Sequence, residues 1–169
     1  IAAAAGVSAE TVYKSFGGKP GIVRAIFERS LLGSAAEPAE RRSDLAQETA
    51  VDARSLFRIF GGFSAEVAPL TAPIIGLIRA ASAAGDPEMT ALLSEVEEKR
   101  HVRMRHNAEV LAARGFLGPG VSVMRAADVM WLYTADDVFA SLVMRRGWTH
   151  EQYGDFIADA LAAALSAPP

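Results

Sequence analysis

The polar side chains that follow the turn Gly6-Val7-Ser8 carry the clearest chemistry in this sequence. A short helix is expected from Ala9 to about Phe16, since Ser8 is a favourable N-cap and Gly17-Gly18 interrupts the helix. At 3.6 residues per turn, Ala9, Glu10, Tyr13 and Lys14 lie on or near one face of this helix. That face presents the carboxylate of Glu10, the phenol of Tyr13 and the ammonium group of Lys14. These groups can accept and donate hydrogen bonds at the surface. Val12 and Phe16 then remain for the core.

The signatures of enzymes and metal sites fail in this chain. Gly18-Lys19 lacks the earlier glycine of a P-loop and is followed by proline. His101 and His106 are five residues apart, which places them on different faces of a helix, and His150-Glu151 has no second histidine. No Gly-x-Ser-x-Gly elbow and no dinucleotide-binding glycine pattern occurs. We therefore expect a protein that is not an enzyme and that uses no metal or cofactor.

The elements that position these residues are expected to be helices throughout. Alternating apolar segments that flank a tight turn are missing, so the prediction is an all-α fold. Residues 1–5 should end a helix before Gly6, and residues 19–33 should form a third one. Residues 34–50 are polar and contain Pro38, which indicates a linker, with at most a helical turn of its own. Two domains follow: a small helix-turn-helix domain in residues 1–33, in which a Gly-Val-Ser turn separates two short helices, and a larger helical domain in residues 34–169.

The larger part of the chain should contain five helices. Two are expected in residues 52–68 and 69–84, and a long one from Asp86-Pro87 to Gly115, because aspartate followed by proline is a strong start signal. After the turn Gly118-Pro119-Gly120, a helix is expected over residues 122–146. The last helix, residues 149–166, begins with Thr149 and Gln152, which match a capping box.

Residues 1–20 resemble the DNA-binding segment of TetR-type (TetR/AcrR-type) transcriptional regulators. The family pattern is Ile-Ala, then Ala-Gly-Val-Ser, a tyrosine, a phenylalanine and a lysine that opens the next helix. This chain matches it at Ile1, Ala2, Ala5, Gly6, Val7, Ser8, Tyr13, Phe16 and Lys19. The chain departs from the family at its start, because the first helix and the beginning of the second are absent, so we interpret Ile1 as a truncation inside an element.

The resemblance implies a role for each matching residue. Thr11, Tyr13 and Lys19 would contact phosphates, with Lys19 helped by the positive end of its helix. Ala9, Glu10 and Lys14 would face base edges, and Ser8 would begin the recognition helix. The charge distribution agrees with this, since residues 1–33 hold four basic and two acidic side chains within a chain of net charge −3.

The resemblance also implies an effector cavity among the middle helices. On the helix that starts after Asp86, the periodicity places Arg100 and Asn107 on the inward, apolar side, where polar groups need partners. The predicted pocket comprises Phe60, Phe63, Ile74, Ile78, Arg100, Met104, Asn107 and Trp131. A hydrophobic or amphipathic effector fits these residues, and an acidic one if Arg100 faces the cavity. The alternative is that Arg100 pairs with Asp136 or Asp137 and no ligand binds.

The last two helices are implied to form a four-helix bundle with the same two helices of a second subunit. Residues 129–133 are apolar all round and need cover on two sides. The predicted interface is Leu132, Tyr153, Phe156, Ile157, Ala160, Leu161 and Ala164. The alternative is that this stripe belongs to an intramolecular core.

Composition sets the class of protein. With 169 residues, of which 51% are hydrophobic and 22% charged, the chain is expected to fold with a substantial core. It has no cysteine, which excludes disulfides, thiolate metal sites and a cysteine nucleophile. The longest uncharged stretch, residues 67–78, is shorter than the ~20 residues of a membrane-spanning helix. We expect a cytoplasmic protein without a membrane partner.

The sequence therefore predicts a ligand-responsive transcriptional regulator, usually a repressor in this family. As a homodimer it would bind a near-palindromic operator in double-stranded DNA, and a small hydrophobic or amphipathic effector would release it. The alternative is a helical carrier of hydrophobic ligands that does not bind DNA.

Overall fold

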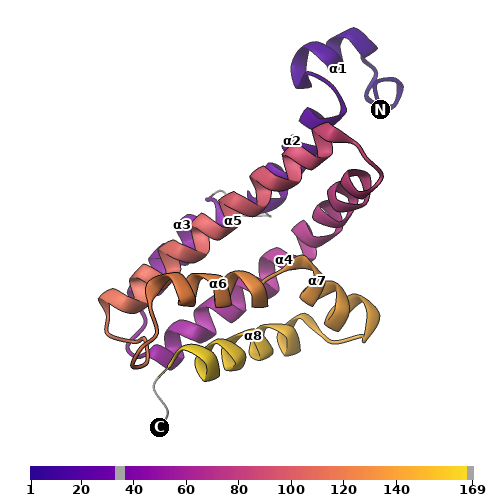
Figure 1. Cartoon of the computed structure of the whole chain (residues 1–169). Coiled ribbons are helices and arrows are strands. Elements are labelled where there is room, and N and C mark those ends of the chain that lie inside the picture. The colour runs from indigo at the N-terminus through magenta and orange to yellow at the C-terminus, as the bar shows by residue number, and fades with distance from the viewer. Residues whose placement is uncertain (33–36, 167–169) are drawn as a thin grey trace.

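The computed structural model of the protein describes residues 1–32 and 37–166. Over these ranges every regular element is a helix and no strand occurs, which confirms the predicted all-α class. Figure 1 shows long helices packed side by side, with the short helix α1 at one end of the molecule. The elements are η1 (Ala3–Ala5), α1 (Ala9–Phe16), α2 (Lys19–Leu32), α3 (Ala39–Glu48), α4 (Ala53–Ala83), α5 (Pro87–Ala113), α6 (Val123–Tyr133), α7 (Asp136–Phe139), η2 (Ala140–Arg145) and α8 (His150–Leu165).

The first 32 residues follow the expected order with two differences. Residues 3–5 form a 3₁₀ turn before Gly6, whose φ is 66°, and not the end of an α-helix. The side chain of Ser8 caps α1 by accepting from the backbone N–H of Thr11 at 3.0 Å. Phe16, expected in the core, is 44% exposed, because α1 packs mainly against α2 and buries none of its residues.

Helix α3 occupies the segment that the sequence analysis interpreted as a linker. Pro38 stands at its N-cap, and Ala39, Ser43 and Gln47 form a buried stripe at four-residue spacing. The linker prediction is wrong over residues 39–48, because small and amide side chains at this spacing pack against α4 despite the polar composition. The predicted helix end near residue 33 and the boundary between residues 33 and 34 lie outside the described residues.

Helix α4 is a single helix of 31 residues, where two helices meeting at residues 68–69 were expected. Asp52 and Ser55 form a capping box at its start, and Pro69 and Pro73 lie inside it. A proline removes one backbone hydrogen bond and normally kinks or breaks a helix. Here contacts with α2, α3, α5, α7 and α8 hold both halves of α4, so tertiary packing outweighs the local break signal.

By length and composition α4 is also apolar enough to cross a membrane, with a mean hydropathy of 1.3 over its best 18-residue window. The count of uncharged residues alone did not reveal this. In the structure α4 packs against α2, α3, α5, α7 and α8, and 28% of this window is buried. The absence of a membrane partner stays a prediction.

Helix α5 begins as predicted at the signal Asp86-Pro87, where the Asp86 carboxylate accepts from the backbone N–H groups of Glu88 and Met89. It ends at Ala113, and Gly115 follows with a φ of 69°. The capping box predicted at Thr149 and Gln152 opens α8.

The helix expected over residues 122–146 is divided into α6, α7 and the π-helical segment η2. A contact from another helix lies at the break after α6. Arg100 of α5 donates to the carbonyl oxygen of Trp131, and the N–H of Ala135 bonds to Leu132 at 3.2 Å instead of continuing the α-helical pattern to Trp131. The carbonyl that the next helical turn would have used is therefore bonded by a side chain of α5.

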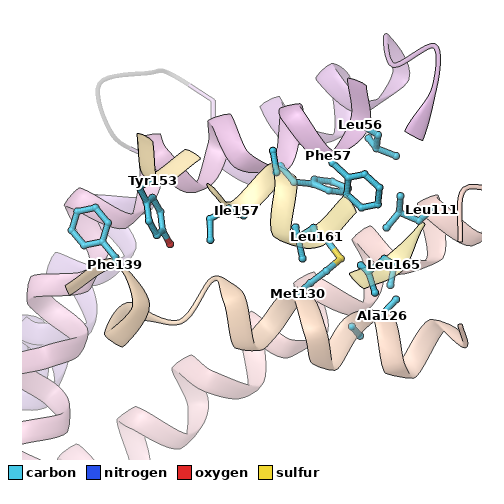
Figure 2. Packing of buried hydrophobic residues seen from close by; sticks show 14 of the residues in the cluster. Leu56, Phe57, Leu111, Ala126, Met130, Phe139, Tyr153, Ile157, Leu161 and Leu165 are labelled. Atoms are coloured by element: carbon cyan, nitrogen blue, oxygen red, sulfur yellow. The ribbon is translucent and has the colours of Figure 1, made fainter. Parts of the chain in front are cut away.

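The core has two parts. The larger cluster lies between α4, α6 and α8, and Figure 2 shows Tyr153, Ile157, Leu161 and Leu165 of α8 within it, opposite Leu56 and Phe57 of α4. The smaller cluster joins α2 to α4 and α5 through Val23, Ile75, Ile78, Met89, Leu92 and Val96.

Candidate functional site

All seven residues predicted to contact DNA are exposed, at the end of the molecule that α1 occupies (Figure 1). Tyr13 is 67% exposed, and Lys14 Nζ lies 2.8 Å from Glu10 Oε1 in an exposed ion pair. Ala9 begins α1 and Lys19 begins α2. The hydroxyl groups of Ser8 and Thr11 form a hydrogen bond of 2.9 Å within the cap. Both side chains are exposed, so each hydroxyl can also bond a group from solvent or a partner.

A residue that the sequence analysis did not single out, Gly21, sets how closely α2 approaches α1. A Cβ atom added at Gly21 would lie 1.6 Å from the carbonyl oxygen of Phe16, so no other residue fits without moving α1. Gly17 and Gly18 between the two helices have φ values of 70° and 131°, which L side chains rarely adopt. The orientation of the exposed face of α1 on α2 is therefore fixed by three glycines.

A half-enclosed cavity of about 210 Å³ lies between α2, α3, α4 and α5, with α6 and α8 closing its floor. Five of the predicted pocket residues line it: Phe60, Phe63, Arg100, Met104 and Asn107. Most of the remaining wall is apolar, and Met130 and Leu161 belong to the larger core cluster beneath it.

Three predicted pocket residues do not line the cavity. Ile78 is fully buried in the smaller core cluster, and Ile74 packs against that cluster. Because α4 continues through Pro69 without a break, these residues face α2 and the start of α5. Trp131 lies under the guanidinium of Arg100, with the Cζ atom 4.6 Å from the ring centroid.

The cavity wall also includes residues that the sequence analysis missed. Phe27 and Leu31 come from α2, the helix that carries α1, and Ser43 comes from α3. The spacing of Ala39, Ser43 and Gln47 was the available signal for α3. Nothing in the sequence pairs Phe27 with α4 and α5, since that contact joins distant segments of the chain.

Arg100 is held by protein groups on every side. It lies 2.7 Å from Glu97 Oε2, and it donates to the carbonyl of Trp131 and to Thr134 Oγ1 at 3.3 Å. The alternative that Arg100 pairs with Asp136 or Asp137 is wrong, because Arg79 occupies Asp136 at 2.6 Å. Through these hydrogen bonds, Arg100 connects α5 to the end of α6.

A second polar cluster lies at the α3 side of the cavity. Gln47, 2% exposed, donates through Nε2 to Asn107 Oδ1 at 3.3 Å, to Ser43 Oγ at 3.1 Å and to Asp44 Oδ1 at 3.4 Å. Arg103 Nη2 lies 2.7 Å from Asp44 in an ion pair. Partial burial raises the pKa of Asp44, but Arg103 and His106 outweigh this and hold the pKa below its usual value.

The predicted dimer stripe on α8 is divided by the fold. Tyr153, Ile157 and Leu161 are fully buried within the larger core cluster (Figure 2), so for these three the intramolecular alternative is correct. Burial raises the pKa of Tyr153 to about 12. The other four predicted residues retain exposed surface: Leu132, Phe156, Ala160 and Ala164.

A cluster of aromatic rings marks the outer side of α8. Phe156 contacts Tyr133 of α6 and Trp148 edge to face, with centroids 6.2 and 5.9 Å apart. Trp148, Phe156 and Ala160 border a shallow hollow on this surface. Within residues 1–32 and 37–166, no group of three histidine or acidic side chains is arranged to hold a metal ion.

Comparison of the chain with protein-family models, with curated proteins and with solved structures finds no match.

Proposed function

We propose that this chain is a TetR-type, ligand-responsive transcriptional regulator that binds a near-palindromic operator as a homodimer and acts as a repressor. The observation that carries the proposal is the double role of α2. At one end it carries α1 with its exposed polar face, and farther along it contributes Phe27 and Leu31 to the cavity wall. One rigid element thus connects the surface that would read DNA to the space that would hold an effector.

The contacts of α2 supply a mechanism for release. Val23 is buried against α4 and α5, and Arg24 forms an ion pair with Glu95 of α5. An effector between Phe27 and the opposite wall would favour a different position of α2 and hence of α1. Two recognition helices fit successive major grooves only when they are about 34–36 Å apart, so a ligand that favours another spacing lowers affinity.

The partly exposed side of α8 is the surface that we assign to the dimer. It combines Phe156, Ala160 and Trp148 with Leu132 of α6, which is 58% exposed. Apolar side chains with small neighbours allow helices from two subunits to approach closely. Three residues of the predicted stripe belong to this surface: Leu132, Phe156 and Ala160.

The test is binding of the chain to operator-sized DNA fragments selected from a random pool, measured by fluorescence anisotropy. Tyr13→Ala and Lys19→Ala should weaken binding to all fragments alike, and Lys19→Ala should reduce the salt slope by about one. Glu10→Gln and Lys14→Ala should change which fragments are preferred, by about 1–3 kcal/mol at the affected base pair.

Arg58→Ala is the matched control, because Arg58 is an exposed cation near the start of α4, away from α1. It should leave affinity and preference unchanged. Equal binding by all five variants and the unmodified chain would contradict the assignment of α1 to DNA.

The cavity by itself also fits the second candidate, a carrier of hydrophobic ligands. Its apolar wall favours that function as much as it favours a sensor. The exposed face of α1 has no role in a carrier. Selection of no DNA fragment, together with ligand binding, would favour the carrier.

A further inference from the structure

We propose that the cavity selects a small neutral ligand that has an apolar body and one hydrogen-bond acceptor, and that Asn107 Nδ2 binds this acceptor. The proposal specifies the effector class and rests on the proposed function for its biological role. Its physical basis is the cavity alone.

The direction of the Asn107 amide follows from a chain of hydrogen bonds. Gln47 lies with Nε2 toward Ser43 Oγ at 3.1 Å and toward the Asp44 carboxylate at 3.4 Å, and its Oε1 is buried without a partner among the described residues. The same Nε2 donates to Asn107 Oδ1 at 3.3 Å, which turns Nδ2 of Asn107 the other way. Asn107 is 5% exposed and lines the cavity, and Nδ2 has no hydrogen-bond partner among the described residues.

An acceptor in the cavity would give this N–H group a hydrogen bond that no described protein group supplies. Nδ2 keeps some accessible surface, so a ligand atom in the cavity can reach it. The ligand atom that faces it is therefore an acceptor and not a donor.

The charges around the cavity argue for a neutral acceptor. Each cation in the wall lies beside a carboxylate: Lys99 is 2.9 Å from Glu95, Arg100 is 2.7 Å from Glu97, and Arg103 Nη2, which is buried and makes no hydrogen bond among the described residues, is 2.7 Å from Asp44. A ligand carboxylate would have to leave water without gaining an unpaired cation, which is unfavourable in an apolar cavity. This proposal differs from the sequence-based expectation of an acidic effector, because Arg100 lines the cavity but is already paired with Glu97.

The volume limits the size of the body. An engineered apolar cavity of about 150 Å³ binds benzene, so about 210 Å³ holds one ring and a short substituent. Phe60 and Met104 supply apolar wall on α4 and α5.

Three probes of nearly equal shape test the proposal: acetophenone, benzoate and α-methylstyrene. Their dissociation constants are measured by ¹⁵N and ¹³C NMR titration of the full chain without DNA. Acetophenone should bind at least ~10-fold more tightly than benzoate, because benzoate brings an uncompensated charge. Acetophenone, and not α-methylstyrene, should shift the side-chain amide resonance of Asn107 downfield.

The variant Asn107→Leu isolates the hydrogen bond. It should change the affinity ratio of acetophenone to α-methylstyrene by about 5- to 10-fold in favour of α-methylstyrene. Ser64→Ala is the control: Ser64 also lines the cavity, but its hydroxyl donates to Phe60 of its own helix at 2.8 Å, so the ratio should stay unchanged.

Benzoate binding as tightly as acetophenone, no binding of any probe, or an unmoved Asn107 resonance would each overturn the proposal. The resonance and the benzoate comparison need no variant, so they decide the matter even if Asn107→Leu fails to fold. Because no DNA is present, loss of operator binding would contradict the proposed function and leave these ratios intact.

Discussion

Glu95 links two helices that are far apart in the sequence. Its carboxylate pairs with Arg24 of α2 and with Lys99 of α5. Hydrogen bonds from Arg24 and Lys99 lower the pKa of Glu95 to about 2, from an ordinary value of 4.5. This partly exposed group connects the helix that carries α1 to the helix that carries the cavity cations.

The lowered pKa predicts an acid-sensitive contact. A carboxylate whose pKa is depressed on folding adds stability above its unfolded pKa, and loses that stability as the pH falls through its folded value. The contribution of Glu95 should therefore be present above pH 4.5 and disappear between pH 4.5 and about 2. Glu95→Gln should lower the free energy of unfolding at pH 7 and flatten its decline in this range, as measured by urea unfolding.

Glu98→Gln provides the control, because Glu98 is exposed on the same helix and forms no ion pair among the described residues. Its pH profile should follow the unmodified chain. A Glu95→Gln profile parallel to that of the unmodified chain would rule out the contact in solution.

At the scale of elements, the crossing of α4 and α8 depends on two glycines. A Cβ atom at Gly61 would lie 2.2 Å from the carbonyl oxygen of Gly154, and one at Gly154 would lie 3.0 Å from that of Gly61. The backbones of the two helices therefore touch at this point, between the halves of the larger core cluster. The neighbouring Gly62 faces open space.

This contrast predicts opposite effects for two adjacent substitutions. Gly61→Ala should destabilise the protein by about 1–3 kcal/mol, because the methyl group forces α8 away from α4. Gly62→Ala should stabilise it by ~1 kcal/mol, because alanine has the higher helix propensity and meets no obstacle. Thermal and urea unfolding measure both, and equal effects of the two variants would show that α8 does not cross α4 at Gly61.

At the scale of the whole molecule, the apolar side chains that stay exposed on α6 and α8 predict where a dimer would form. Leu132 of α6 is 58% exposed, and Ala160 of α8 borders a shallow hollow with Phe156 and Trp148. Burial of this surface in a dimer would stabilise the assembly through apolar area.

Leu132→Glu and Ala160→Glu should therefore convert a dimer of the chain into single subunits, as measured by light scattering coupled to size-exclusion chromatography. Leu45→Glu is the matched control, since Leu45 of α3 is 54% exposed, close to the 58% of Leu132. A dimer that survives both substitutions would place the interface elsewhere.

Local sequence by itself determined the all-α class, the N-caps at Ser8, Asp86 and Thr149, and the bounds of α1 within one residue. These features depend on side chains that bond backbone groups two or three residues away, so the sequence contains all the information they need. The inward position of Asn107 was also readable, since it follows from the helical period alone.

Only the tertiary structure decided that α4 continues through Pro69, that Arg100 bonds the end of α6, and that Tyr153 is buried in the core rather than facing a second subunit. Each outcome depends on which distant helix packs against the segment, and the energy of that packing exceeds the local preference. The same holds for the cavity. Phe27 and Asn107 both line it because α2 packs against α4 and α5, and residue spacing within one helix cannot predict that contact.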